Sequence, residues 1–351
     1  MRLIDRFIQN SSFVFNKPTV LPRVIWNYFR KGILRQNPLR TVDLVFEYRC
    51  NYKCSHCYAA DFEDREKSPL SVSDIFETVD KCCQEGAIHF NIIGGEPTLH
   101  KDLFKLIDRI NKKAAISSLA TNGSMIDEEF ARKLKKNGLD VVLLSLDSLD
   151  EKEHDQIRGK GSYKKAIRAL ESCFKAKLKV YISTVLTKQN IRDGSMEKLE
   201  HFCGEKEMLL HTNLPALYGM WKGRDDLFFN EQDKELVKKL YKGKHVRACE
   251  MTSYFSTRCR SGVEKLHITA YGDVMPCTFV PISFGNIKKE GLSEIRKRML
   301  TYPFISEHNE MCIPSTNKGY NEFMKEKLAP GKVPIPHENI LQELQRTSNP
   351  L

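Results

Sequence analysis

The chain has 351 residues, of which 41% are hydrophobic and 29% charged. This composition suits a folded core and excludes a mostly disordered chain. No apolar run approaches the ~20 residues needed to span a bilayer, and the N-terminal stretch lacks the apolar segment of a secretory signal. Eleven cysteines in such a chain indicate reduced thiols, metal ligands or cluster ligands, so we expect a cytoplasmic protein.

The net charge of +11 is concentrated near the N-terminus, because residues 1–40 hold eight bases and one acid. Two short amphipathic helical patterns lie there, formed by Leu3, Ile4, Phe7 and Ile8, and by Ile25, Tyr28, Phe29 and Ile33. Two interpretations stay open: a helical extension packed on the main domain with its bases in solvent, or a peripheral membrane contact through residues 1–36. We do not expect nucleic acid as a partner.

From residue 40 onward, strand-like and helix-like runs alternate. The strand-like runs are Thr41–Tyr48, Ile88–Ile93, Ile116–Ala120, Val141–Leu146, Val180–Leu186 and Met208–Asn213. The helix-like runs include Ser71–Glu85, Asp127–Lys136, one that opens near Ser162 and one after Asn230. Six β-α repeats predict an α/β fold, a partial (β/α)6 TIM-like barrel with its functional end at the strand C-termini.

Beyond residue 242 the alternation stops. Lys265–Ala270 and Val274–Val280 predict a β-hairpin, and four prolines after residue 328 predict an extended tail. We therefore divide the chain into a basic amphipathic extension (1–40), the barrel (41–242), a small C-terminal β-hairpin/α cluster-binding domain (243–328) and a proline-containing tail (329–351).

Cys50, Cys54 and Cys57 follow the first strand with C-x3-C-x2-C spacing. Three thiolates in one short loop can hold three corners of a [4Fe–4S] cluster and leave one iron open. The spacing alone also allows a zinc knuckle. The second strand runs into residues 94–97 (Gly-Gly-Glu-Pro), where two glycines permit close approach to the backbone and Glu96 adds an acceptor for an ammonium group.

In this order, each at a strand end, the two motifs resemble the radical SAM superfamily over about residues 40–240. The resemblance implies that the three cysteines ligate the cluster and that its open iron chelates S-adenosylmethionine (SAM). It also implies SAM contacts from His56, Tyr58, Gly94, Gly95, Glu96, Pro97, Asn122, Ser145, Asp147 and Arg158. Glu47, His211 and Asn213 are further candidates for the barrel mouth.

A second cysteine group begins at Cys259 and continues with Cys277, which closes a G-x4-C pattern, and Cys312. This resembles the opening of the SPASM and Twitch domains, which hold auxiliary iron–sulfur clusters. The later cysteine block of a full SPASM domain is absent, so we expect one auxiliary [4Fe–4S] cluster. Cys249 is our preferred fourth ligand, with Ser315, His308 or an open site as alternatives.

The resemblance implies that an electron from a flavodoxin- or ferredoxin-type donor cleaves SAM to a 5′-deoxyadenosyl radical, which abstracts hydrogen from substrate carbon. An auxiliary cluster favours a net oxidation or a bond-forming modification. The substrate stays open: a small-molecule natural product, a lipid or membrane-associated compound, or a peptide that is crosslinked or epimerised. The forty residues before the barrel are too few for a compact domain that binds a leader peptide, so we rank the peptide substrate below the other two. A zinc protein that contacts nucleic acid is the remaining alternative, but it does not explain two motifs at strand ends.

Overall fold

The computed structural model describes residues 17–64, 66–249, 259–302, 305, 311–328 and 333–340. One sheet of nine strands has the order β7-β6-β5-β4-β3-β2-β1-β8-β9. Its strands are β1 (Thr41–Val45), β2 (His89–Ile93), β3 (Ile116–Thr121), β4 (Val141–Ser145), β5 (Lys179–Val185), β6 (Leu209–Asn213), β7 (Val246–Ala248), β8 (Lys265–Ile268) and β9 (Val274–Met275).

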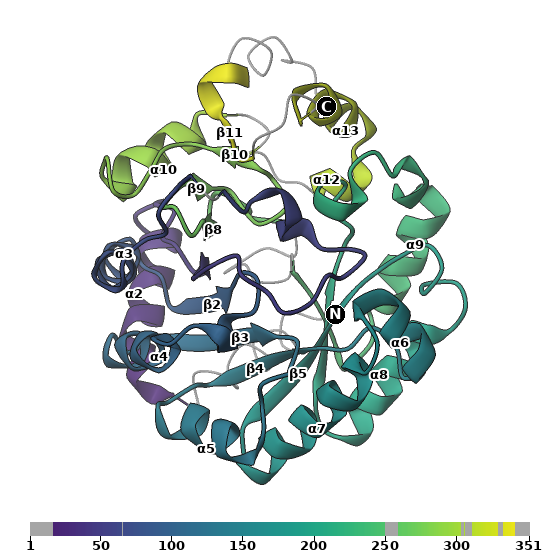
Figure 1. The fold of residues 1–351 in the computed structure, drawn as a ribbon. Coiled ribbons are helices and arrows are strands. Elements are labelled where there is room, and N and C mark those ends of the chain that lie inside the picture. Colours follow the sequence, from purple (N-terminus) through teal and green to yellow (C-terminus); the bar gives the residue numbers. More distant parts are fainter. Residues whose placement is uncertain are drawn as a thin grey trace.

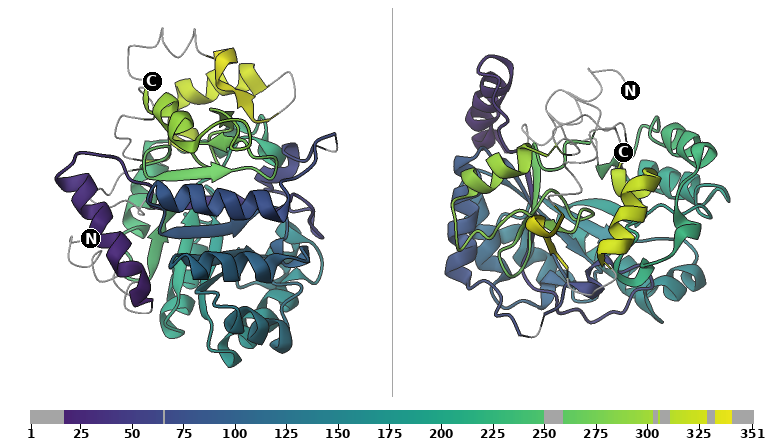
Figure 2. Two further views of the ribbon diagram at one scale, coloured as in Figure 1. Left: turned by 90° about the vertical axis from the view of Figure 1, so that its left-hand side faces the viewer. Right: turned by 90° about the horizontal axis from the view of Figure 1, so that it is seen from above.

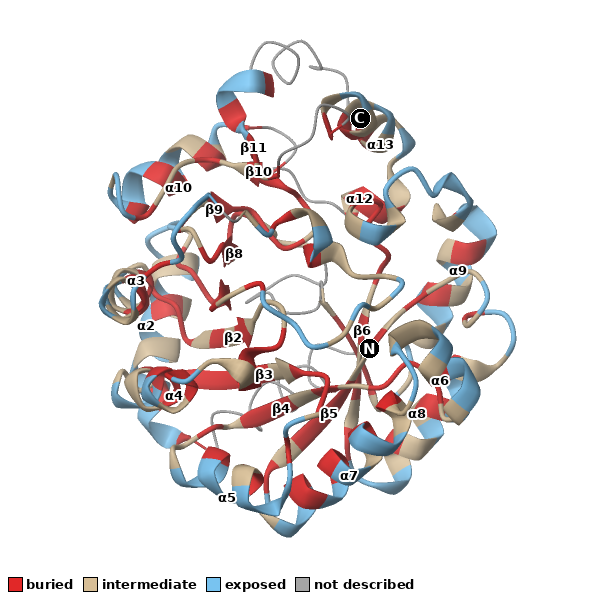
Figure 3. Cartoon of the chain, in the orientation of Figure 1, coloured by how far each residue is buried: buried red, intermediate tan, exposed pale blue. Residues whose placement is uncertain are grey.

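All neighbouring strands of this sheet pair in parallel except β8 and β9, which are antiparallel. The helices lie outside the curved sheet (Figure 1), and their outer faces are exposed while the strands are buried (Figure 3). They are α2 (Leu21–Gly32), α3 (Val72–Gln84), α4 (Leu103–Lys112), α5 (Glu128–Lys136), α6 (Glu151–Arg158), α7 (Ser162–Lys175), α8 (Ser195–Glu205), α9 (Glu231–Leu240), α10 (Leu292–Leu300), α12 (Ile313–Thr316) and α13 (Lys318–Leu328). The predicted α/β partial barrel is confirmed.

The helix starts follow from local capping. The Ser71 hydroxyl accepts a hydrogen bond from the backbone N–H of Asp74 at 3.2 Å, and the Asp74 carboxylate accepts from the N–H of Ser71 at 2.9 Å. Asn230 and Asp233 form the same reciprocal box at the start of α9. Such boxes satisfy backbone donors that a helix start leaves without partners, so these starts could be read from sequence.

The sheet continues beyond the six predicted strands at both edges. Strand β7 adds to β6, and β8 pairs with β1 through Thr41–Lys265 and Asp43–His267. The hairpin of β8 and β9, which was expected in a separate domain, is therefore part of the barrel sheet. The short strand β10 (Ile282–Ser283) pairs with β11 (Ile335–Pro336), so the described part of the tail is not simply extended.

Helix α2 and the turn before it pack on the end of the barrel where the strands begin. Val20, directly before α2, packs there with Ile88, Ile116, Val141 and Tyr181, and Val24 and Tyr28 of α2 lie against this cluster. Figure 2 shows α2 beside the ends of α3 and α4, outside the barrel wall. The packed extension is thus present, although the helical pattern at residues 3–8 lies outside the described residues. Within the described part of the chain, no helix combines the length and apolar character needed to cross a bilayer.

Candidate functional site

The two sequence motifs form one hydrogen-bonded unit at the C-terminal ends of β1 and β2. The backbone N–H of Gly95 donates to the carbonyl of Glu47 at 2.9 Å, and that of Glu96 donates to the carbonyl of Arg49 at 2.9 Å. The segment that carries the glycines is therefore fastened to the segment that leads into Cys50.

The glycine pair makes this contact sterically feasible. A Cβ atom on Gly94 would stand 2.2 Å from the carbonyl oxygen of Glu47, and one on Gly95 would stand 2.3 Å from that of Arg49. Gly94 also has φ of +146°, in the region that favours glycine. We expected these glycines to let a ligand approach the backbone. In the structure, their missing side chains make room for the backbone that leads into the cysteine loop.

Cys50, Cys54 and Cys57 all line one cavity of about 260 Å³ that lies inside the barrel. Burial raises the pKa of each thiol, and each is raised further by a neighbouring cysteine of the group. Their grouping fits a cluster ligand set, because positive irons would stabilise the thiolates that burial disfavours. Among the described residues no three His, Cys, Asp or Glu side chains share a single-ion site, but a cubane binds each thiolate at a different iron.

Glu96 is almost fully buried, and its carboxylate joins the ends of β2 and β3. One oxygen accepts from the Thr121 hydroxyl at 2.7 Å and from the hydroxyl and N–H of Thr98, and the other accepts from the N–H of Asn122 at 2.7 Å. Burial raises the pKa of Glu96, while these hydrogen bonds oppose the rise. The Glu96 side chain lines the cavity, yet its two carboxylate oxygens already accept hydrogen bonds from four protein donors.

Arg158 reaches the cysteine loop from the end of α6. Its Nε donates to the Asp147 carboxylate at 2.5 Å, and its Nη1 lies 4.0 Å from the Cys54 sulfur. Burial alone would raise the pKa of Asp147, but the charge of Arg158 lowers it well below its usual range. Burial lowers the pKa of His56 to about 4, so its imidazole is neutral near pH 7 beside Arg158 and Trp221.

Most of the predicted SAM contacts line the cavity. They are His56, Tyr58, Gly94, Gly95, Glu96, Asn122, Ser145 and Arg158, and the further candidates His211 and Asn213 line it as well. Pro97, Asp147 and Glu47 do not line it. Asp147 instead holds Arg158 in place, which makes it a positioning residue for the cavity wall.

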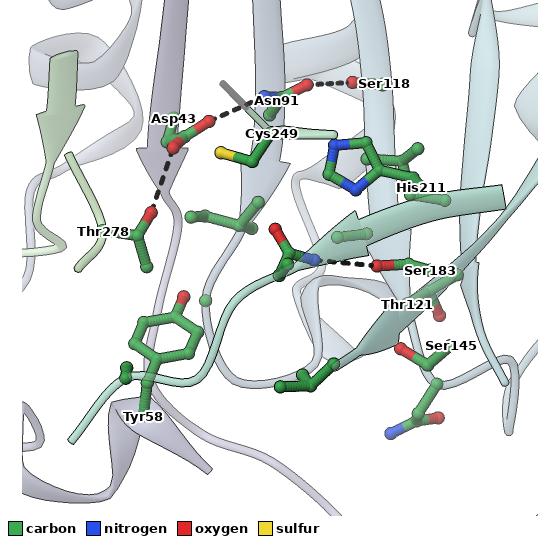
Figure 4. Close-up of a pocket in the computed structure, with 18 of the residues that line it drawn as sticks. Asp43, Tyr58, Asn91, Ser118, Thr121, Ser145, Ser183, His211, Cys249 and Thr278 are labelled. Atoms are coloured by element: carbon green, nitrogen blue, oxygen red, sulfur yellow. Dashed lines mark hydrogen bonds between the residues drawn. The ribbon is translucent and has the colours of Figure 1, made fainter. Parts of the chain in front are cut away.

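A polar layer deeper in the barrel was missed by the sequence analysis. Asp43 accepts from Asn91 at 2.6 Å, from Thr278 at 3.0 Å and from the Lys265 ammonium at 3.0 Å, and Ser118 continues the chain through Asn91 (Figure 4). Burial alone would raise the pKa of Asp43, but Lys265 and the hydrogen bonds lower it. The available signal was a charged or amide residue at alternate positions of otherwise apolar strands.

The second cysteine group also comes together. Cys259, Cys277 and Cys312 line one small pocket with Pro276 and Ile305. Burial raises the pKa of the Cys277 thiol, and Lys265 opposes the rise. Three thiols that face one apolar pocket fit the ligand set of an auxiliary cluster.

Neither Cys249 nor Ser315, the described candidates for a fourth ligand, lines that pocket. Cys249 lines the barrel cavity, where its sulfur lies 3.2 Å from the Lys265 ammonium, and it does not line the pocket of the other three (Figure 4). The Ser315 hydroxyl donates to the carbonyl of Pro215 at 2.7 Å. His308 lies outside the described residues.

Comparisons with known proteins agree with this geometry. Residues 44–199 match the Radical SAM superfamily, and residues 259–313 match SPASM, an iron–sulfur cluster-binding domain. The chain is 35% identical over 173 residues to Fe-coproporphyrin III synthase of Methanosarcina barkeri, covering 49% of this chain and 39% of the relative. It is 34% identical over 145 residues to the mycofactocin maturase MftC of Mycolicibacterium smegmatis, covering 41% and 37%. The matches therefore span about two-fifths of each relative's length.

Solved structures share the fold. The structure of anSMEcpe with bound AdoMet has a TM-score of 0.61 at 22% identity, covering 88% of this chain and 95% of that one. SuiB of Streptococcus suis bound to its precursor peptide SuiA has a TM-score of 0.59 at 21% identity, covering 78% and 68%. The two matched domains imply a [4Fe–4S] cluster with SAM and an auxiliary iron–sulfur cluster. The chain therefore carries a radical SAM domain at residues 44–199 and, after it, a SPASM domain at residues 259–313.

Proposed function

We propose that this protein is a radical SAM enzyme that modifies a substrate carbon inside its barrel. The observation that carries the proposal is the cavity that joins Cys50, Cys54 and Cys57 to the polar layer around Asp43. When bound, the cluster and SAM supply a 5′-deoxyadenosyl radical that abstracts hydrogen from an unactivated carbon. The boundaries 1–40, 41–242, 243–328 and 329–351 remain part of this proposal, with the hairpin of 265–275 counted in the barrel sheet.

The chain's own residues prepare that chemistry. Cys50, Cys54 and Cys57 would hold the radical SAM cluster, and Cys259, Cys277 and Cys312 the auxiliary one. Arg158, fixed by its buried ion pair, presents a cation beside Cys54 that suits the carboxylate of SAM. Asp43, Glu96 and Asp147 are buried, so the inner part of the site lies away from bulk water, as a reactive radical requires, while Cys50 at its mouth is exposed.

The substrate would lie against the inner polar layer. Asn91, Ser183, His211 and Lys265 offer donors and acceptors to the cavity, so the bound part of the substrate should carry polar groups next to the reacting carbon. We keep a small-molecule or lipid-derived substrate as the first choice. A peptide substrate is the second candidate, because the similarity to the maturase MftC favours it.

The electron donor, a flavodoxin or ferredoxin, is likewise a proposal. The cytoplasmic location expected from the sequence also remains a proposal. The contact of residues 1–36 with a membrane is a further proposal, which depends on helix α2 and not on the barrel cavity.

The test measures iron, acid-labile sulfide and 5′-deoxyadenosine release after anaerobic reconstitution, with dithionite and SAM. The wild-type protein should hold about eight iron per chain and release 5′-deoxyadenosine. Cys54→Ala should lose about four iron and all 5′-deoxyadenosine release. Cys173→Ala is the matched control, because Cys173 is buried in α7 and lines neither pocket, and it should behave as wild type.

Zinc without iron in the wild-type protein, or 5′-deoxyadenosine release by Cys54→Ala at the wild-type rate, would overturn the proposal. Iron that falls to zero in Cys54→Ala would contradict two separate cluster sites. Turnover with candidate small molecules and with peptides separates the two substrate classes, since only a true substrate raises 5′-deoxyadenosine release above its uncoupled rate.

A further inference from the structure

The outer face of helix α2 is apolar and exposed. Six of the nine large hydrophobic side chains that are exposed among the described residues lie within residues 21–34. They are Leu21, Ile25, Trp26, Phe29, Ile33 and Leu34, and we call them the α2 stripe. Ile25, Trp26 and Ile33 expose 59%, 54% and 69% of their surface, and the rings of Trp26 and Phe29 stack at 5.4 Å. A contiguous patch of this kind marks an interaction surface.

The barrel determines which way the stripe faces. On the opposite side of α2, the Asn27 amide donates to the carbonyl of Gly86 at 2.7 Å, and Arg23 donates to the carbonyls of Ala87 and Lys113 at 3.1 and 2.8 Å. The Lys31 ammonium lies 3.1 Å from the Glu264 carboxylate. These contacts all reach segments that lead into strands, so the stripe points away from the end of the barrel where the strands begin.

The same end of the barrel is basic. Helices of a parallel βα barrel run back from the C-terminal to the N-terminal ends of the strands, so their last turns gather here. Exposed lysines occupy these turns and the loops after them: Lys135, Lys136, Lys177, Lys242 and Lys244. The exposed acids of these loops, Glu205 and Glu207, flank Lys206 at one position. Lysines at helix ends complement the helix dipoles, but they still leave a positive surface at the end of the barrel on which α2 packs.

We propose that this end of the protein docks on an anionic lipid surface. An amphipathic helix with Trp, Phe and Ile on one face, at an end of the barrel that also carries exposed lysines, matches the two contributions that hold a protein at a bilayer surface: burial of apolar side chains among headgroups, and attraction to anionic lipids. The positive charge of this end of the barrel favours anionic lipid over a second copy of the chain, because two such ends would repel each other.

Docking at this end would leave the cysteine loop directed away from the bilayer. Cys50, Cys54 and Cys57 follow the C-terminal end of β1, while α2 packs near the starts of β2, β3 and β4. A soluble electron donor could then reach the cluster while the protein stays at the membrane. The docking surface and the catalytic cavity are separate, so the inference does not rest on the proposed chemistry.

The test is sedimentation of the full chain with vesicles of phosphatidylcholine alone and with about 30% phosphatidylserine. Deletion of residues 1–36 would remove Val20 and Asn27 from the barrel floor, so point variants are cleaner. Ile25→Asp/Phe29→Asp should weaken binding by at least about 100-fold, because two large apolar side chains no longer bury. Lys135→Gln/Lys136→Gln should weaken it about 30-fold at low salt, from ~1 kcal/mol per base.

Matched controls lie elsewhere on the molecule. Met125→Asp changes a side chain that is 44% exposed, close to the 43% of Phe29. Lys160→Gln/Lys164→Gln removes one exposed lysine between α6 and α7 and one in the first turn of α7, at the end that carries the cysteine loop. Both should bind anionic vesicles as wild type does.

The inference is overturned by a wild-type protein that does not bind anionic vesicles. Equal binding to neutral vesicles, or binding unchanged by Ile25→Asp/Phe29→Asp, would also overturn it. So would a wild-type dimer in sedimentation equilibrium that becomes monomeric in that variant, since the stripe would then be an interface between copies.

Discussion

The close packing of the two motif loops makes a definite prediction for Gly95→Ala. The new methyl group would stand 2.3 Å from the carbonyl oxygen of Arg49 and 2.4 Å from that of Tyr48, far inside van der Waals contact with backbone that cannot swing away. The loops must separate, and the hydrogen bonds from Gly95 to Glu47 and from Glu96 to Arg49 are lost or lengthened. At about 1–2 kcal/mol for each bond, the substitution should cost about 2–4 kcal/mol of the free energy of unfolding.

Gly95 does not have a positive φ, so backbone strain does not complicate this reading. Urea denaturation of the apoprotein measures the free energy of unfolding, and iron content after reconstitution reports the cysteine loop. Gly32→Ala is the control, because a Cβ at Gly32 meets no atom within 4 Å in α2, and it should be neutral or stabilising by up to about 1 kcal/mol. Gly95→Ala with wild-type stability and iron, but without SAM binding, would refute the reasoning and return the glycine to a role in ligand approach alone.

Three further predictions concern the interior of the barrel. Asp43→Ala should cost about 3–5 kcal/mol by leaving the Lys265 ammonium buried without its carboxylate, and Asp43→Leu/Lys265→Met should recover much of that loss in urea denaturation. Burial, with a further contribution from Arg247, lowers the pKa of His211 to about 3, so the folded state holds a neutral imidazole while the unfolded chain takes up a proton below pH ~6.5. Stability should therefore fall as pH drops from about 6.5, by about 2 kcal/mol at pH 5 for this residue, and His211→Gln should flatten the pH profile of the unfolding midpoint. Asp147→Asn should raise the concentration of SAM needed for half-maximal 5′-deoxyadenosine release more than it lowers the maximal rate, because Arg158 loses its anchor; equal iron content in both proteins is the control.

Local signals explain what the sequence could predict. The starts of α3 and α9 depend on Ser71 with Asp74 and on Asn230 with Asp233, pairs three residues apart whose contacts need no knowledge of the rest of the chain. The parallel strands were found because each apolar run is bounded by turn residues. The three cysteines that follow β1 were placed at a common cavity because strand C-termini meet at one end of such a barrel.

Non-local contacts explain what it could not. The pattern of Ile25 and Phe29 identified the apolar face of α2, but the structure buries the opposite face, where Val24 packs on the barrel and the Asn27 amide donates to the Gly86 carbonyl. Hydrophobicity alone cannot decide which face of a helix is buried, because a mixed face can also pack on the core when its polar group has a buried hydrogen-bond partner. The preferred ligand Cys249 was chosen by its distance along the chain from Cys259, and that distance does not report which pocket the thiol faces.

The pairing of β8 with β1 brings the auxiliary site close to the barrel cavity. Thr278 lines the cavity and donates to Asp43, and it follows Cys277 directly in the chain. Lys265 lines the same cavity, and its pKa is raised by Asp43, Cys249 and Cys277 despite burial. A thiolate of the second cysteine group therefore lies one residue beyond the wall against which we place the substrate. An electron left on the substrate after hydrogen abstraction would have a short path to a cluster on Cys277, which is the arrangement that a net oxidation needs.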